Sequence, residues 1–232
     1  MSILLVLVLF SFNLLVNAAA ANTLTEIIPA EHEALERWKH SLYYYEVAIV
    51  PDWNTTTSCN TSDGRITCSE EGSVIGIDLS YHHLEGNLNH LNFSSLPHLS
   101  VLILQGNNLN GTIPQEIGTL TNLIHLNLNS NLFGGDLPIS LGNLTSLVHL
   151  DLSNNNLNGP IPPKIGNLNH LLELRLSHNN LSGHLPPEIG TCYISTRQAN
   201  EHDIDDDDAI SSLPVDDMGH SVLWSVDDMD LA

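Results

Sequence analysis

The stretch LPHLSVLILQGNNLNGTIPQEIG occupies residues 96–118, and closely similar stretches begin at Leu120, Leu144 and Leu168. Each copy therefore restarts 24 residues after the one before it. Recurrence at such a period is typical of a solenoid, in which each copy is one structural unit that cannot bury its apolar face alone. The stretch predicts an elongated array of stacked rungs with a thin core.

Two leucines separated by one residue recur in every copy, in the alternating pattern of a strand with one buried face. The pairs are Leu102 and Leu104, Leu126 and Leu128, Leu150 and Leu152, and Leu174 and Leu176. Ile77 and Leu79 fill the same positions in an irregular first copy over residues 77–95. We therefore expect five parallel strands, stacked about 4.8 Å apart.

An asparagine follows each regular strand, three residues after its second leucine, and these residues are Asn107, Asn131, Asn155 and Asn179. A side-chain amide both donates and accepts hydrogen bonds, so a buried asparagine at the strand exit can satisfy backbone groups of the turn. We expect these residues to form a structural asparagine ladder. His82 takes the place of asparagine in the first copy and can do only part of this task.

The repeats fit LxxLxxLxLxxNxLxGxIPxxIGxL, and they follow ALERWKHSL at residues 34–42, a tryptophan before a cysteine pair, and ITCSEEGSVIGIDLS at residues 66–80. These phrases resemble the N-terminal cap and the plant-specific leucine-rich repeats of plant receptor-like kinases over about residues 31–190. The resemblance implies an α/β solenoid of horseshoe shape, with a parallel β-sheet on the concave face and an N-terminal cap. It also implies an extracellular module that recognises a protein or peptide, truncated before the membrane span and the kinase.

Composition divides the chain into four segments. Residues 3–16 are an apolar run followed by small residues, which predicts a secretory signal over residues 1–20, with an uncleaved anchor as the alternative. We expect a cap with a short helix at Glu31–Ser41 over residues 21–72, and five repeats over residues 73–191. Residues 192–232 are expected to be an acidic, disordered tail, because eleven acidic residues and no Lys or Arg lie after residue 200.

The repeat register also predicts where the array ends. A further copy would need leucines at positions 192, 195, 198 and 200, but the chain has Cys192, Ser195, Gln198 and Asn200 there. We therefore predict no sixth rung.

Secretion permits disulfides, so Cys59 and Cys68 are expected to pair and Cys192 to remain single. A zinc site that joins the cysteines to His82 and His83 is the rival interpretation. Six N-x-S/T glycosylation sequons agree with secretion, at Asn54, Asn60, Asn92, Asn110, Asn143 and Asn180.

The outward positions of the predicted strands form the candidate binding surface on the concave face. These residues are Asp78, Val101, Ile103, Gln105, His125, Asn127, Asn129, His149, Asp151, Glu173 and Arg175. None of the sequons lies on the predicted strands, so attached glycans would leave this face clear.

Two histidines, His125 and His149, lie one period apart on this surface, in a file that continues to Glu173. Acidic neighbours favour the protonated form of an imidazole. Either the two histidines change the charge of the face, so that an acidic ligand binds better at low pH, or they are solvated residues without a link to binding.

The formal net charge is −21 with only six Lys and Arg residues, which argues against nucleic acid or an anionic membrane as a partner. No apolar run after the N-terminal one is long enough to span a membrane. No catalytic, cofactor-binding or metal-binding motif is present, so we expect neither an enzyme nor a cofactor.

Recognition of a protein or peptide is the favoured function, with a receptor-like kinase as one candidate partner. One alternative is a soluble inhibitor of a secreted cell-wall hydrolase, similar to polygalacturonase-inhibiting proteins. The other alternative is a truncated fragment without independent function.

Overall fold

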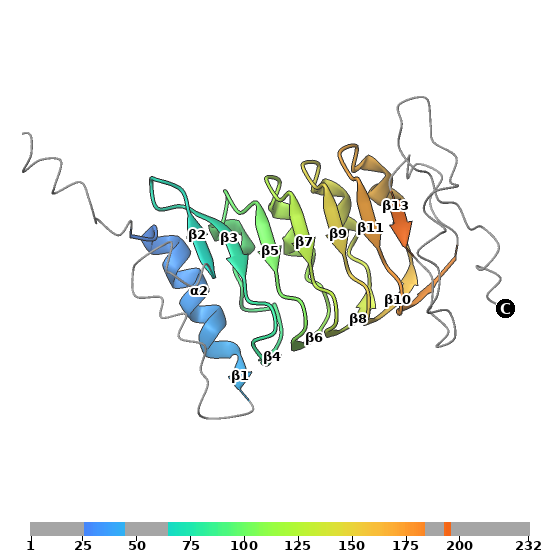
Figure 1. Cartoon of the computed structure of the whole chain (residues 1–232), viewed down its shortest axis with the longest axis horizontal. Coiled ribbons are helices and arrows are strands. Elements are labelled where there is room, and N and C mark those ends of the chain that lie inside the picture. The colour runs from blue at the N-terminus through green and yellow to red at the C-terminus, as the bar shows by residue number, and fades with distance from the viewer. Residues whose placement is uncertain (1–25, 45–64, 184–192, 196–232) are drawn as a thin grey trace, which may run out of the picture.

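The computed structural model describes residues 26–44, 65–183 and 193–195. Within these residues two sheets run along the molecule, each built from one short strand per rung (Figure 1). The main sheet has seven strands in the order β13-β11-β9-β7-β5-β3-β2, and the side sheet has six in the order β1-β4-β6-β8-β10-β12. We call the solvent side of the main sheet the concave face.

The strands of the main sheet are β2 (Ile66–Cys68), β3 (Val74–Asp78), β5 (Val101–Ile103), β7 (His125–Asn127), β9 (His149–Asp151), β11 (Glu173–Arg175) and β13 (Tyr193–Ser195). The strands of the side sheet are β1 (Tyr43–Tyr44), β4 (Leu84–Gly86), β6 (Asn108–Gly111), β8 (Leu132–Asp136), β10 (Asn156–Pro160) and β12 (Asn180–Ser182). The helices are α2 (Pro29–Ser41) and the one-turn 3₁₀ helices η1 (Phe93–Ser95), η2 (Gln115–Thr119), η3 (Ile139–Asn143) and η4 (Pro163–Asn167).

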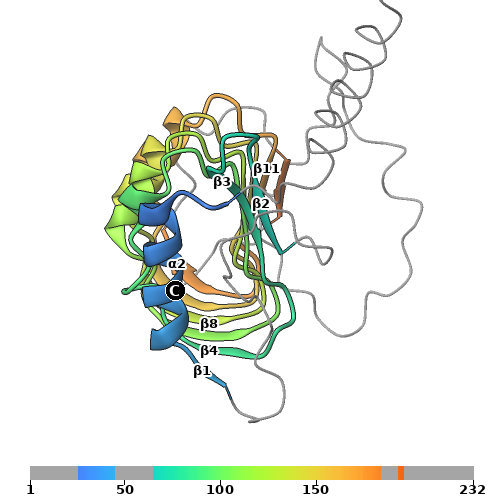
Figure 2. The same cartoon turned by 90° about the vertical axis from the view of Figure 1, so that its left-hand side faces the viewer.

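Stacked rows of leucine fill the space between the sheets and the 3₁₀ helices. These helices lie on the opposite side of the rungs from the main sheet (Figure 2). Leu102, Leu126, Leu150 and Leu174 are partners on neighbouring parallel strands, and all are at most 1% exposed. The predicted parallel sheet with one buried face is therefore confirmed. Because every rung buries the same row, each one depends on its neighbours for burial.

The asparagine ladder is confirmed in atomic detail. The Asn131 amide nitrogen donates to the carbonyl oxygen of Leu128 in its own rung, at 3.1 Å, and to that of Leu104 in the preceding rung, at 2.9 Å. Its amide oxygen accepts from the backbone N–H of Leu109 at 3.1 Å. Equivalent bonds recur at Asn107, Asn155 and Asn179. Each asparagine therefore ties two adjacent rungs together.

The glycine of the IG phrase allows neighbouring 3₁₀ helices to approach closely. A Cβ atom on Gly142 would lie 2.3 Å from the carbonyl oxygen of Lys164 in the next rung, and one on Gly118 would lie 2.6 Å from that of Ser140. No side chain fits at these distances. The repeated glycine is therefore needed for stacking on the helical side of the rungs.

The cap helix α2 packs on the first rung through a buried carboxylate and a buried indole. Glu31 is 2% exposed and accepts hydrogen bonds from the Ser73 hydroxyl and the Val74 backbone N–H. Trp38 is fully buried and donates to the carbonyl oxygen of Asn87 at 2.9 Å. The helix begins at Pro29, two residues before the expected start, because proline is favoured in the first turn.

The C-terminal end of the array differs from the expectation. Tyr193–Ser195 pairs with β11 as a sixth parallel strand, with Glu173 opposite Tyr193, so a strand follows the fifth rung although the sequence predicts no sixth rung. Strand β13 lies 20 residues after β11 instead of 24, which is why a fixed leucine register missed it. Strand pairing is formed by backbone groups, and it does not require the repeat leucines.

Several predicted features lie outside the described residues: the secretory signal, Cys59, Cys192, the sequons at Asn54 and Asn60, and the acidic tail except for residues 193–195, which form β13 instead of being disordered. Cys68 is disulfide-bonded, which excludes it as a thiolate ligand of zinc. Pairing with Cys59 stays a prediction. In the part of the chain that the structure describes, no helix is long and apolar enough to cross a membrane.

Candidate functional site

Two parallel files of side chains cross the concave face from rung to rung. The register pairs Val101, His125, His149 and Glu173 in one file, and Ile103, Asn127, Asp151 and Arg175 in the other. The structure therefore brings the predicted residues together as the 24-residue spacing requires. Asp78 opens the second file in the first rung, three strands away from Asp151.

A linked set of charges occupies the end of the face near β11. Arg175 lies 2.5 Å from a carboxylate oxygen of Glu173 and 3.7 Å from one of Asp151. Nδ1 of His149 lies 3.2 Å from the other carboxylate oxygen of Glu173. One arginine thus serves two carboxylates, which leaves this end negatively charged when the histidine is neutral.

His125 stands in the middle of its file, between Val101 and His149. Its ring centre is 5.4 Å from that of His149, and the His125 side chain is half-buried. Burial lowers the pKa of His125, the charge of His149 lowers it further, and the carboxylates of Glu173, Asp151 and Asp78 only partly oppose this. The sequence had suggested that acidic neighbours favour its charged form, and for His125 this was wrong because loss of solvent outweighs their attraction.

Two residues of the predicted surface are buried instead of facing a ligand. Asp151 is 8% exposed and accepts from the Ser153 backbone N–H at 3.0 Å and from the Ser153 hydroxyl. Asn129 is 9% exposed and donates to the same hydroxyl. The Asp151 side chain lies against its own strand exit, whereas the Asn129 side chain reaches Ser153 in the next rung. These two side chains therefore support the concave face without being exposed on it.

The end of the face near β3 has a different chemistry and an exposed aromatic ring. The Gln105 amide donates to the Tyr81 hydroxyl at 2.7 Å, and the Asn127 amide donates to Gln105 at 3.3 Å. Tyr81 is 65% exposed and was missed by the sequence analysis. Its signal was available, since the equivalent positions in later rungs hold Gly106, Ser130, Asn154 and His178.

An apolar edge borders the first file and was also missed. Ile124, Val148 and Leu172 precede the outward residues of β7, β9 and β11, and Ile124 and Leu172 are 46% and 59% exposed. The positions are one period apart, so the pattern was visible in the sequence.

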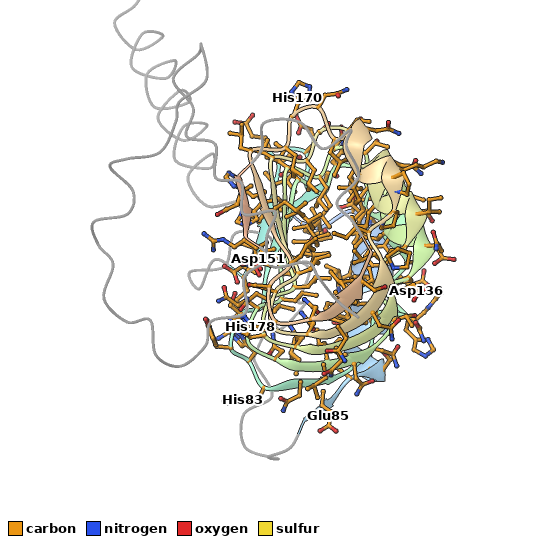
Figure 3. The ribbon with its side chains drawn as sticks, turned by 90° about the vertical axis from the view of Figure 1, so that its right-hand side faces the viewer. His83, Glu85, Asp136, Asp151, His170 and His178 are labelled. Carbon is orange, nitrogen blue, oxygen red and sulfur yellow. The ribbon has the colours of Figure 1, made fainter. Side chains whose placement is uncertain are left out.

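The four sequons within the described residues lie away from the concave face. Asn110 is in β6 and Asn180 in β12, both in the side sheet, while Asn92 and Asn143 are at the 3₁₀ helices. All four are exposed. In Figure 3, Asp151 marks the main sheet and Asp136 marks the side sheet, which form separate faces of the molecule. Glycans at these sites would leave the concave face open.

No group of three or more His, Cys, Asp or Glu residues within the described ranges is placed to hold a metal ion. His82 instead lies with Nδ1 2.6 Å from the carbonyl oxygen of Ser80. Its backbone N–H is bound by the Asn107 amide oxygen. Asn107 thus bonds the first rung in the same way as Asn131 bonds the second.

Comparison with known families agrees with this geometry. Residues 97–157 and residues 170–192 match two family models that are both described as leucine rich repeat. The parallel-strand solenoid and these matches show that the chain has a leucine-rich-repeat fold over the matched residues.

The similarity extends to plant receptors. Receptor-like protein 47 of Arabidopsis thaliana is 35% identical over 105 residues, which cover 40% of this chain and 13% of that protein. The chain thus spans only a small part of that relative's length.

Three solved structures share the fold. The BIR3–SERK2 complex of Arabidopsis thaliana is 29% identical with a TM-score of 0.59, covering 71% of this chain and 92% of the matched one. The ectodomain of the Arabidopsis receptor kinase HAESA with a bound IDA peptide hormone is 28% identical with a TM-score of 0.54, over 72% and 32%. A plant ice-binding protein is 28% identical with a TM-score of 0.65, over 74% and 56%. Proteins with this fold therefore have different ligands, so the ligand has to be inferred from the residues of the site and not from the fold.

Proposed function

We propose that the chain is an extracellular, non-catalytic recognition module that binds a peptide or protein segment across the concave face of the main sheet. A receptor-like kinase is a second candidate partner, in keeping with the similarity to the BIR3–SERK2 complex. The observation that carries the proposal is the pair of ordered files that cross the rungs on a face without glycosylation sequons, half-buried except for the buried Asp151 and the exposed Arg175.

The chemistry of the face supports a segment bound along the solenoid axis. Val101 and Ile103 offer half-buried apolar surface in the second rung, whereas Glu173 and Arg175 offer charges in the fifth. A ligand that crosses these rungs meets different groups at each step, which is what sequence-specific recognition needs. The HAESA structure binds a peptide hormone on the same kind of scaffold.

A glycan placed on this face is the direct test. Arg175 is exposed and Ser177 follows two residues later, so Arg175→Asn creates a sequon in the fifth rung. Wild type and variant, produced by secretion in plant cells, are used for affinity capture from extracellular fluid, with bound peptides and proteins identified by mass spectrometry. We expect the glycosylated variant to lose the specific ligand because the sugar covers both files.

The matched control is Arg175→Asn with Ser177→Ala, which loses the same guanidinium group but cannot be glycosylated. We expect the control to retain at least part of the binding, and all three proteins to melt alike. Undiminished capture by the fully glycosylated variant would move the site away from the concave face. Recovery of a cell-wall hydrolase instead of a peptide or receptor would favour the inhibitor alternative.

A further inference from the structure

Tyr81 has a backbone conformation that its residue type disfavours. Its φ angle is 58°, and the equivalent residues Gly106, Ser130, Asn154 and His178 have φ angles of 68°, 54°, 53° and 54°. The turn after every strand of the first five rungs thus requires the left-handed region. A bulky aromatic residue there is strained, and such strain persists where the surrounding structure holds it and often marks a functional site.

The next rung is shaped to receive the Tyr81 ring. A Cβ atom on Gly106 would lie 2.3 Å from both Cδ1 and Cε1 of Tyr81, so the ring covers the Gly106 α-carbon and a side chain there would displace it. The Gln105 amide holds the hydroxyl at 2.7 Å, and the Tyr81 backbone N–H donates to the Gln105 carbonyl oxygen at 2.8 Å. The ring is fixed at both ends, yet the residue is 65% exposed.

Groups that both donate and accept hydrogen bonds surround this ring. The amides of Gln105 and Asn127 are linked by one bond at 3.3 Å, and each keeps a second N–H for a ligand. The Tyr81 hydroxyl accepts from Gln105 and keeps its own proton to donate. The carboxylate of Asp78 is fixed through Oδ1, which accepts from the backbone N–H and hydroxyl of Ser80.

We propose that Tyr81 is a stacking platform for a sugar ring, and that the surface of Tyr81, Gln105, Asn127 and Asp78 binds a neutral saccharide. A pyranose has an apolar C–H face and a rim of hydroxyls that donate and accept. The exposed aromatic face can stack on the C–H face of the sugar, and the amide groups can bond its hydroxyls. The rung spacing of about 4.8 Å is close to the length of one sugar unit in an extended chain, so successive units can meet successive rungs.

Charge selects a neutral saccharide over an acidic one. The chain carries a formal net charge of −21, and Asp78 is the one charged member of the surface. An acidic polysaccharide would be repelled. A cationic side chain stacked on Tyr81 is the competing ligand, because Asp78 keeps its charge while Ser80 donates to it. The uncharged amides of Gln105 and Asn127 and the Tyr81 hydroxyl match the hydroxyl rim of a sugar more closely than a cation, which needs acceptors only.

Calorimetric titration of the full secreted chain with neutral β-linked hexasaccharides of glucose, xylose and mannose tests this proposal. We expect at least one of the three to bind, and Tyr81→Asn to weaken that binding by about tenfold or more, because the stacking surface is lost. Asparagine tolerates the left-handed region, so this variant should fold at least as stably as wild type. Tyr81→Phe keeps the platform and should stay within about threefold of wild type.

Leu132→Ala is the matched control, since Leu132 is a 50% exposed apolar residue in β8 of the side sheet. It should bind the saccharide as wild type does, and a hexamer of galacturonic acid should not bind. The proposal is overturned if none of the neutral hexasaccharides binds, or if their affinity is the same for wild type and Tyr81→Asn. Binding of an arginine-containing peptide alone, lost in Tyr81→Asn, would instead assign the ring to a cation.

Discussion

The interior asparagine ladder and the outer files of the concave face repeat with the same period but obey different constraints. Every regular rung has asparagine at the interior position, and each amide bonds backbone groups of two rungs. The outer file changes from Val101 to His125 and then to Glu173, and its bonds join side chains to side chains. Backbone groups are the same in every rung, so only one residue type fits inside, whereas side-chain partners can change together.

This difference separates the fold from the proposed binding surface. The interior positions fix how one rung lies on the next, and the outer positions can vary without disturbing the stacking. A scaffold of this kind can present different ligand chemistries on one framework. The predictions below test how complete that separation is.

The largest effect is expected from an interior leucine. Leu152 is fully buried in the fourth rung, so Leu152→Ala should lower the free energy of unfolding by about 2–5 kcal/mol through lost burial and a cavity. Leu172 is the matched exposed leucine, and Leu172→Ala should change it by less than about 0.5 kcal/mol. Urea unfolding followed by circular dichroism compares the two. Equal losses would mean that the apolar edge belongs to the core.

An interior asparagine should come next. Asn131→Ala leaves the Leu109 N–H without its acceptor and removes one of the two amide donors that each of the Leu104 and Leu128 carbonyl oxygens has. Each buried group left unpaired costs about 1–3 kcal/mol. Asn127→Ala, on the outer file, leaves only the part-buried Asn129 N–H without its acceptor and should cost less, about 0.5–1 kcal/mol. The same urea experiment measures the free energy of unfolding of both variants. A similar loss of stability at the two positions would remove the distinction between the interior asparagine ladder and the outer files.

Much of this comparison was visible in the sequence, because the repeat period fixes which residues share a row. The leucine rows, the asparagine ladder and the partners within each outer file all follow from the 24-residue spacing. The spacing does not tell how side chains turn once they leave the backbone. Burial of Asp151 depends on a local bond to Ser153, and the pose of Tyr81 depends on the gap at Gly106. Strand β13 was not predicted because it lies 20 residues after β11, instead of the 24 of the repeat.

A smaller, pH-dependent effect is expected at His125. Because its pKa is lowered in the folded protein, the unfolded chain binds a proton more readily as the pH falls below the ordinary value of 6.5. The wild type should therefore lose stability between pH 7.5 and pH 5, and His125→Gln should flatten that loss. Urea midpoints of both proteins across this range give the answer. A steeper loss in the variant would show that the histidine is stabilised by its acidic neighbours.

The most direct measurement compares one interior residue with a whole outer file. The outer-file variant carries Val101→Thr, His125→Thr, His149→Thr and Glu173→Thr together. Threonine suits strands, so the sheet should persist without the original side chains. We predict that this fourfold variant loses less free energy of unfolding than the single substitution Asn131→Ala, with the same cooperative transition. A greater loss from the fourfold variant would contradict the separation of fold from binding surface.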